Sequence, residues 1–336
     1  MATQPVTPSV ASAPPMTATG RRRLLRQGGG GRRGGRSETL AAYLFLLPYL
    51  LVIGVFLVFV SLYGIGLSLF RIDIGFTAPE FIGFHYYQVL FSQLADVADS
   101  DFWTSMINII KFVVVIVTFQ TILALVLAVL LQNAVLKSRP TIKGIFRTIF
   151  YIPALTSSVA VSLIFLWFYN PNGLFNYLLS LAHIRGPLWL EDPFWALPAI
   201  MILNIWTTGA AFMIYFLAAL QDIPQELIEA AEVDGANRFQ AFWHITLPLL
   251  RPAIFLVVAL GTIGGFQMFD QVFFMTNPPG SPLNSTLTPL LEIYNEAFQN
   301  NRFGSAAAMS VILFIVILIV TLIQRRFIDV GSNANA

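Results

Sequence analysis

The sequence predicts an all-α integral membrane protein with six transmembrane helices. Of the 336 residues, 57% are hydrophobic and only 11% are charged, and the mean hydropathy is +0.74. Several runs exceed the ~18 apolar residues that a helix needs to cross a bilayer. The basic residues also gather in alternate loops, as they do in multi-pass membrane proteins. The sequence has no cysteine, which excludes disulfides and cysteine-bound metals.

Residues 1–38 form a segment of their own. They begin with Pro, Ser, Thr and Ala and end in RRRLLRQGGGGRRGGR, which carries seven of the nineteen Lys and Arg residues. No apolar run here is long enough for a signal-peptide core, so we expect no cleavage. A Gly-rich basic tract can bind nucleic acid, but next to a membrane span it more often holds a terminus in the cytoplasm. We therefore expect a disordered, positively charged cytoplasmic tail and no nucleic-acid partner.

Residues 39–330 are expected to form one transmembrane domain, followed by a short tail at 331–336. The apolar runs place spans near 40–70, 106–131, 145–168, 194–220, 253–275 and 306–323. Fifteen Lys and Arg residues fall on one side of this arrangement and four on the other. The positive-inside rule then places both termini and residues 222–252 in the cytoplasm.

Residues 222–252 are the one long polar segment between two apolar spans. Asp222 is expected to cap a short helix, and Gly235 to end it in a left-handed turn. Asn237 can cap a second short helix, which Pro248 and Pro252 close. The segment therefore predicts a helix–Gly–helix elbow between two spans.

The elbow resembles a known motif. Glu229-Ala230-Ala231, then Gly235, then Ile245-x-Leu247-Pro248 match the spacing of the EAA loop in permease subunits of ABC importers. Further stretches resemble the carbohydrate-uptake branch of these permeases, which belongs to the MetI-like superfamily: GIFRTIFYIP at 144–153, NPNGLFN at 170–176, IGGFQMFDQVFFMT at 263–276 and FGSAAAMSVILF at 303–314. The resemblance covers roughly residues 81–326.

This resemblance implies a type I ABC importer permease fold in the bacterial inner membrane. It also implies a second permease chain (in this family usually a different one), two copies of a P-loop ATPase and an extracytoplasmic substrate-binding protein. Glu229 would make a polar contact with the ATPase, and Pro248 would free the elbow from the fifth span. The residues implied in coupling are Glu229, Ala230, Ala231, Asp234, Gly235, Ile245, Leu247 and Pro248. Gly235→Asp or Glu229→Lys is then predicted to abolish uptake while leaving the protein in the membrane.

No catalytic motif is present in the chain itself. It lacks G-x-x-x-x-G-K-[ST], so it has no P-loop, and it lacks H-E-x-x-H. Its three histidines fall in different loops, which gives no support for a metal site or a Ser-His-Asp arrangement. We expect a non-catalytic subunit that binds no cofactor, with ATP and Mg²⁺ used by the partner ATPase.

Polar residues inside the spans are candidates for contact with a transported substrate, because they are costly there and usually face a bundle interior. The fourth and fifth spans supply Asn204, Trp206, Thr207, Thr208, Gly265, Gln267, Met268 and Asp270. Neutral amides beside aromatic rings suit an uncharged, polyhydroxylated ligand. Each position can equally serve helix–helix hydrogen bonding, and Gly261-x-x-x-Gly265 favours a close helix crossing.

Two alternatives remain open from the sequence. An ion-driven secondary transporter acting alone would need ion-coordinating residues at mid-membrane and an internal repeat, and only Asp270 and Lys111 come near. The same importer class could also carry glycerol phosphate, a polyamine or a peptide. The external loops at 71–105 and 276–305 are candidates to receive an extracytoplasmic partner, and an amphipathic helix is expected near 287–298.

Overall fold

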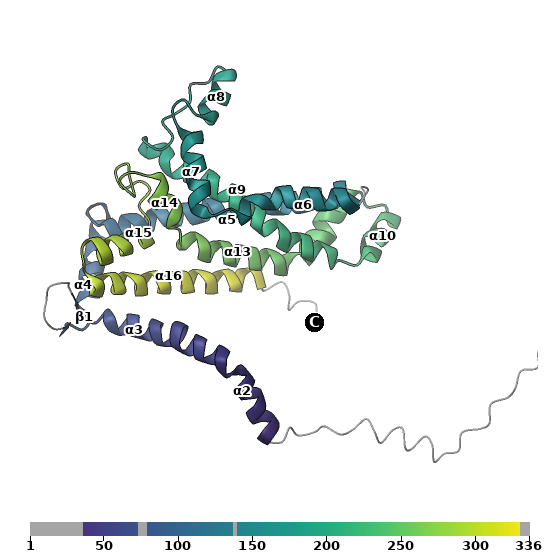
Figure 1. Ribbon diagram of the computed structural model, residues 1–336. Coiled ribbons are helices and arrows are strands. Elements are labelled where there is room, and N and C mark those ends of the chain that lie inside the picture. Colours follow the sequence, from purple (N-terminus) through teal and green to yellow (C-terminus); the bar gives the residue numbers. More distant parts are fainter. Residues whose placement is uncertain (1–35, 73–78, 137–139, 330–336) are drawn as a thin grey trace, which may run out of the picture. The chain divides into compact units, whose positions relative to one another are not determined.

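The computed structural model describes residues 36–72, 79–136 and 140–329, which are almost entirely helical (Figure 1). It divides into two compact units, Met1–Ser61 and Leu62–Ala336. Of the predicted tail, residues 1–35 lie outside the described residues, and so does the segment 331–336.

The first unit contains α2 (Arg36–Val52), the π-helical η1 (Ile53–Phe59) and the first residues of α3 (Val60–Leu67). Together these elements supply a candidate membrane span, Tyr43–Leu67, which corresponds to the first predicted span. Almost all of its large apolar side chains are exposed, for example Phe45 at 87% and Phe56 at 71%. Such a surface is stable in lipid or against another apolar surface and costly in water.

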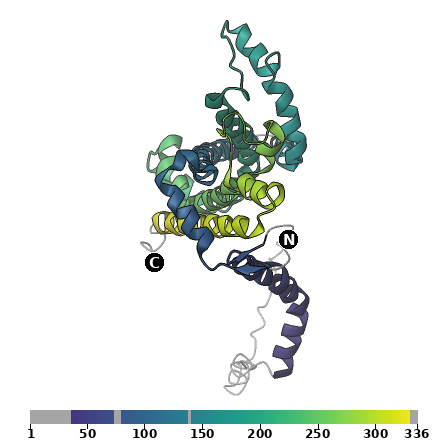
Figure 2. The same cartoon turned by 90° about the vertical axis from the view of Figure 1, so that its left-hand side faces the viewer.

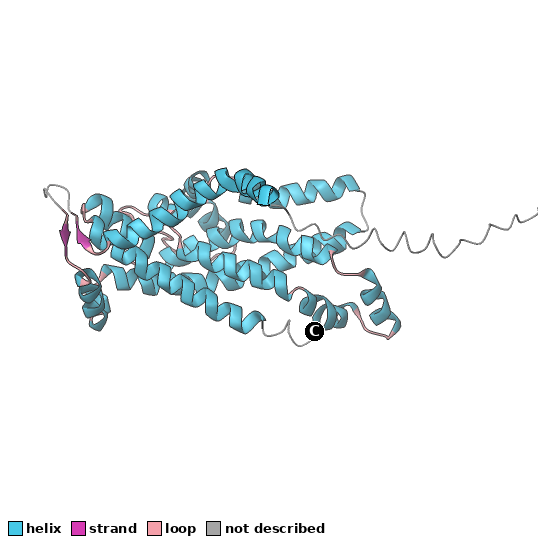
Figure 3. Ribbon diagram, turned by 90° about the horizontal axis from the view of Figure 1, so that it is seen from below, coloured by secondary structure: helices cyan, strands magenta, loops and turns pink. Residues whose placement is uncertain are grey.

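The second unit is built around long helices that lie side by side (Figures 1 and 3). These helices are α5 (Asp101–Leu136), α9 (Pro193–Gln221), α13 (Arg251–Phe266) and α16 (Phe303–Asp329), with α6 (Pro140–Leu155) along α9. The core lies between α5 and α9, where Phe112, Ile200 and Met213 are completely buried. Within the described residues, five helices are long and apolar enough to cross a membrane, or six if one bent pair counts as a span.

The third predicted span, 145–168, is not one straight helix. It comprises α6 and α7 (Ser158–Tyr169), which are separated at Thr156 and Ser157. Pro153 has no N–H for the hydrogen-bond ladder of α6, which ends at Leu155, and Ser157, with an extended ψ of 136°, is the N-cap of α7. After Tyr169 the chain continues into α8 (Leu174–Leu181), and Figure 2 shows this arm projecting from the side of the bundle.

The fifth predicted span, 253–275, is broken as well. The helix α13 ends at Phe266 and the short α14 runs from Asp270 to Met275. At its other end, α13 meets the elbow at a bend of 64°. The non-helical residues 267–269 between these two helices line the cavity that is the candidate site.

The two ends of the second unit carry different structures (Figure 1). One end carries the elbow, built from α10 (Gln225–Val233), α11 (Arg238–Ala241), the π-helical η4 (Phe242–Thr246) and α12 (Leu247–Leu249). The opposite end is the distal end. It carries α4 (His85–Ser92), η2 (Gln93–Ala95), η3 (Val97–Asp99), α15 (Pro289–Tyr294) and η5 (Asn295–Gln299). It also carries the antiparallel strands β1 (Phe70–Arg71) and β2 (Glu80–Phe81). The helix expected near 287–298 is thus present as α15 and η5.

Candidate functional site

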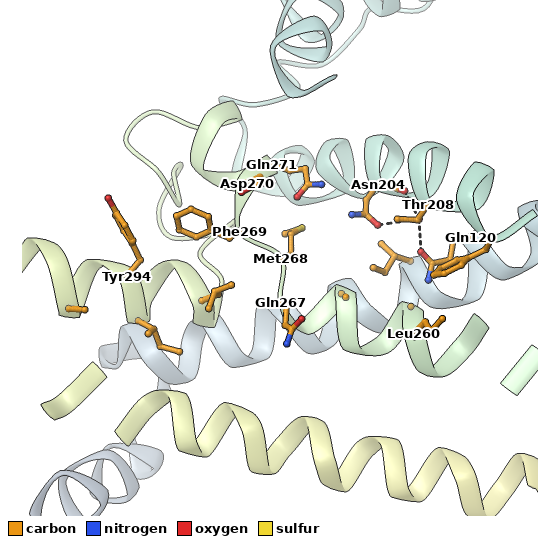
Figure 4. A pocket seen from close by; sticks show the side chains of 18 of the residues that line it. Gln120, Asn204, Thr208, Leu260, Gln267, Met268, Phe269, Asp270, Gln271 and Tyr294 are labelled. Carbon is orange, nitrogen blue, oxygen red and sulfur yellow. Dashed lines mark hydrogen bonds between the residues drawn. The ribbon is translucent and has the colours of Figure 1, made fainter. Parts of the chain in front are cut away.

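The strongest candidate site is a cavity of about 640 Å³ inside the second unit (Figure 4). Its walls come from α5, α9, α13, the 267–269 break, α14, α15 and η5. This volume falls within the ~300–1,000 Å³ that small-molecule sites occupy. The lining residues are Ile116, Gln120, Asn204, Thr208, Phe212, Leu260, Gly261, Gly264, Gly265, Gln267, Met268, Phe269, Asp270, Gln271, Leu290, Ile293, Tyr294, Ala297 and Phe298.

A polar network forms the end of the cavity that is nearer the elbow. The Thr208 hydroxyl lies 2.6 Å from Gln120 Oε1 and 2.6 Å from the carbonyl oxygen of Asn204. A hydroxyl has one proton and can donate to only one of these acceptors at a time. Gln120 is completely buried, and its Nε2 has no hydrogen-bond partner among the described residues. In either orientation of the Gln120 amide, one of its two polar atoms lacks a hydrogen-bond partner. That atom is available to bind a ligand or a water molecule.

Glycines on α13 make room for this network. A Cβ at Gly261 would collide with the Gln120 amide nitrogen, and a Cβ at Gly265 would lie 3.0 Å from side-chain atoms of Ile116 and Val113. At Gly264, one turn along on the cavity side, a Cβ would meet nothing within 4 Å. The close helix crossing expected from the Gly-x-x-x-Gly spacing is therefore confirmed, and the neighbouring helix is α5.

The break after α13 brings a second group of polar side chains to the cavity. Gln267 is exposed toward it, whereas Met268 is 3% exposed and packs in the core. Asp270 begins α14, and its carboxylate accepts a hydrogen bond from the Ser158 hydroxyl of α7. Of the described residues that line the cavity, Asp270 is the only charged one, so this lining is close to neutral.

Aromatic rings form the distal part of the lining. Phe269 lies 5.3 Å from Tyr294, and Tyr294 lies 5.2 Å from Phe298, measured between ring centroids. These distances are typical of packed aromatic pairs. The cavity thus has amides and a hydroxyl at one end, with the ring of Phe212 beside them, and a group of three aromatic rings at the other.

Six of the eight predicted substrate-pathway residues line this cavity: Asn204, Thr208, Gly265, Gln267, Met268 and Asp270. Trp206 does not line it, because its ring lies 5.5 Å from that of Phe165 and is 44% exposed. Nor does Thr207, whose hydroxyl bonds back to the carbonyls of Leu203 and Asn204. Sequence reasoning missed Gln120, although an amide in the middle of the mostly apolar residues 112–131 of α5 was a usable signal.

The elbow has the predicted helix–Gly–helix geometry. Gly235 has φ +85°, and the N–H of Ala236 donates to the Ala231 carbonyl at 2.9 Å, which closes the end of α10. Asn237 and Gln240 form a reciprocal capping box with both hydrogen bonds at 2.9 Å. The expectation that Asp222 caps α10 was wrong. Asp222 instead ends α9 in a helical conformation, and Pro224 occupies the N-cap position.

The elbow also presents an exposed apolar surface. Val233 is 87% exposed, Phe239 71% and Trp243 50%. Of the predicted coupling residues, Glu229, Ala230, Asp234 and Gly235 are exposed, while Ala231, Ile245, Leu247 and Pro248 are half-buried. The Glu229 carboxylate accepts a hydrogen bond of 2.7 Å from Gln225. Pro248 has no N–H for the regular helical ladder, and the 64° bend follows within two residues.

A group of charged side chains lies at the distal end. Glu296 is 6% exposed, accepts from Asn300 at 2.9 Å and lies 3.7 Å from Arg302. Burial, with Asp101 and Glu296 nearby, raises the pKa of Glu292 to about 7. Among the described residues, no group of three or more His, Asp or Glu could hold a metal ion.

Comparisons with known proteins give consistent matches. Residues 120–329 match the family model "Binding-protein-dependent transport system inner membrane component". The chain is 34% identical to the probable ABC transporter permease YesP of Bacillus subtilis over 292 residues, which cover 86% of this chain and 90% of that protein. It is 37% identical to the lactose transport system permease LacF of Rhizobium radiobacter, over 67% of this chain and 76% of LacF. A chain in the crystal structure of a bacterial ABC transporter that imports alginate matches with a TM-score of 0.73 and 24% identity, over 91% of this chain and 98% of that one.

Proposed function

The chain belongs to the family of binding-protein-dependent transport system inner membrane components and is a permease subunit of an ABC importer, and we propose that its cargo is a neutral sugar. It is a non-catalytic, multi-pass membrane protein. The observation that carries the proposal is the composition of the cavity, whose described lining residues supply amides, a hydroxyl and aromatic rings but only one carboxylate.

Sugar chemistry fits each part of this lining. The hydroxyl groups of a sugar need both donors and acceptors, and the side chains of Gln120, Asn204 and Gln267 supply both. The C–H face of a sugar ring packs on aromatic rings such as those of Phe269 and Tyr294. The lactose cargo in the name of LacF supports the same class.

A charged cargo fits this cavity less well. A phosphorylated ligand would need cationic side chains, and no Lys or Arg in the described part of the chain lines the cavity. A polyamine would need several carboxylates, whereas the described lining residues supply only that of Asp270, which already accepts a hydrogen bond from Ser158. An ion-driven transporter would need several groups to coordinate its ion, and Asp270 is the one carboxylate that the described lining residues offer.

The partners follow from the family and from the surfaces of the chain. We propose that the exposed apolar elbow docks on a P-loop ATPase in the cytoplasm and that two copies of this ATPase, with Mg²⁺, hydrolyse ATP. The charge asymmetry of the loops supports a cytoplasmic elbow and an external distal end. A second permease chain would complete the translocation pathway, and an external binding protein would deliver the sugar. Closure of the ATPases would move the elbow, and the bend at the start of α13 would transmit that movement to the cavity wall.

Transport by the reconstituted complex tests the proposal. The chain, purified with its associated subunits, is placed in proteoliposomes with ATP inside and binding protein outside, and uptake of labelled oligosaccharides, glycerol phosphate, a polyamine and a peptide is compared. We expect ATP-dependent uptake of a neutral oligosaccharide alone. Uptake of the phosphate, the polyamine or the peptide instead would overturn the cargo, and uptake that follows an ion gradient without ATP would overturn the mechanism.

A further inference from the structure

A leucine at the distal end is held in an unusual conformation. Leu283 lies in the loop between α14 and α15, has φ +49° and is 88% exposed. A left-handed backbone is rare for a bulky side chain, and glycine or asparagine adopts it at lower cost. An exposed leucine also leaves its apolar surface in water. Neither feature stabilises the isolated chain, so both point to a role that involves another molecule.

The loop is rigid because its threonines are buried and bonded. Thr276 Oγ1 accepts from the N–H of Gly280 at 2.9 Å, and the Thr286 hydroxyl donates to the Ser281 carbonyl at 2.8 Å. The Thr288 hydroxyl donates to the carbonyl of Met268 at 3.0 Å, next to the cavity. These bonds fix both sides of the loop below its tip.

The tip itself is tied to α5. The Asn108 side chain donates to the carbonyl of Asn284 at 2.8 Å, and Asn108 is 8% exposed. The Asn284 side chain donates to the Asp101 carboxylate at 2.8 Å. Since Asn284 directly follows Leu283, the leucine has a fixed position and its docking would cost little conformational entropy.

We propose that Leu283 is an anchor for the external substrate-binding protein and inserts into an apolar pocket on that protein. The inference rests on the proposed function, which places the distal end outside the cell and requires such a partner. It adds the contact: a preorganised leucine on a loop that is bonded to the cavity wall at Met268. Docking at Leu283 would thus act on a loop that is directly connected to the site of cargo passage.

The surroundings of Leu283 favour a protein over a lipid surface. A hollow of about 430 Å³ lies beside it, with Pro282 and Ser281 in its wall. The hollow also includes the exposed carboxylate of Glu191 and the exposed amides of Asn170 and Asn277. An apolar anchor with a polar rim is typical of protein interfaces, whereas a carboxylate beside the anchor disfavours an anionic membrane surface.

The test compares Leu283→Gly with His183→Gly in the assembled transporter in nanodiscs. Both residues are exposed and have positive φ, so both changes relieve the backbone, but only the first removes an apolar anchor. The probe is the extracytoplasmic protein that stimulates ATP hydrolysis by the wild-type complex, and its Kd is measured by titration. We expect Leu283→Gly to weaken binding about tenfold or more and His183→Gly to change it less than about twofold, since a buried leucine side chain contributes at least that factor.

Equal affinities for the two variants would overturn the anchor while leaving the importer function intact. Because the chain has no cysteine, Leu283→Cys can also be labelled with a fluorophore at this position alone. Quenching by brominated lipids before the binding protein is added would place the side chain in the membrane and overturn the inference. If no external protein stimulates the wild-type complex, the proposed function fails and the anchor fails with it.

Discussion

Replacing Gly235 by alanine isolates the effect of backbone strain at the elbow. Gly235 has φ +85°, and a Cβ added there would meet no atom within 4 Å. The substitution therefore introduces no collision and changes only the cost of the left-handed conformation. For an L-residue this cost is roughly 1–2 kcal/mol. Glycine has no such cost, so its presence keeps the two helices of the elbow at their observed angle.

The expected effect follows directly from that cost. If the ATPase binds only the observed elbow geometry, strain of roughly 1–2 kcal/mol weakens its binding by up to about 5- to 30-fold. The core of the bundle is not involved, because Gly235 is exposed in the elbow, which lies at one end of the second unit. The thermal unfolding temperature should therefore change little while binding of the ATPase weakens.

The assay is a titration of purified ATPase onto the permease in nanodiscs, followed by binding-protein-stimulated ATP hydrolysis. Gly235→Asn is the matched control, because asparagine adopts the left-handed region more readily than alanine. We expect the affinity for the ATPase to be highest with glycine at position 235, lower with asparagine and lowest with alanine. An alanine variant with wild-type affinity and wild-type uptake would refute the role of this turn in coupling.

Gly261→Ala and Gly264→Ala form a matched pair on one helix. Gly261→Ala forces the Gln120 side chain to move and should destabilise the complex by roughly 1–3 kcal/mol relative to Gly264→Ala, as measured by thermal unfolding. Equal stabilities of the two variants would contradict the close contact between Gly261 and Gln120. Among the described residues, Asp270 is the only charged one in the cavity lining, so Asp270→Asn should lower neutral-sugar uptake by no more than about threefold. A larger loss would show that neutral-sugar uptake depends on this carboxylate, contrary to the proposed neutral contacts. Glu292 has a pKa raised from 4.5 to about 7, so the stabilisation it provides is complete below about pH 4.5 and is lost as the pH rises through about 7. The free energy of unfolding should fall by roughly 1–3 kcal/mol over this range, which is measured as a lower unfolding temperature. Glu292→Gln should remove this pH dependence.

Much of the elbow was predictable because its signals are local. Gly235 ends α10 with a positive φ, and Asn237 forms its capping box with Gln240, as turn and capping preferences indicate. The prediction for Asp222 failed because α9 ends only at Gln221, so Asp222 takes the C-cap position of α9 and Pro224 the N-cap position of α10. The boundary between a buried helix and a short polar one depends on packing as well as propensity.

The cavity was only partly predictable. The polar residues of the fourth and fifth spans were visible against an apolar background, and six of the eight line the cavity. The facing helix was not apparent, since Gln120 lies about 84 residues before Asn204 in sequence and meets Thr208 only after folding. Trp206 and Thr207 sit beside lining residues in sequence but point elsewhere, because successive residues of a helix project in different directions.

The sequence by itself determined the class of the protein, since the length and number of its apolar runs, the distribution of basic residues and the spacing of the elbow motif are all linear properties. The tertiary structure decided where helices break and which side chains share a cavity. It broke the third and fifth predicted spans and turned Gly261 toward Gln120. It also placed Leu283 in a left-handed conformation beside Asn284, whose carbonyl accepts a hydrogen bond from Asn108, far away in sequence. These features depend on contacts between segments distant along the chain, which local composition does not encode.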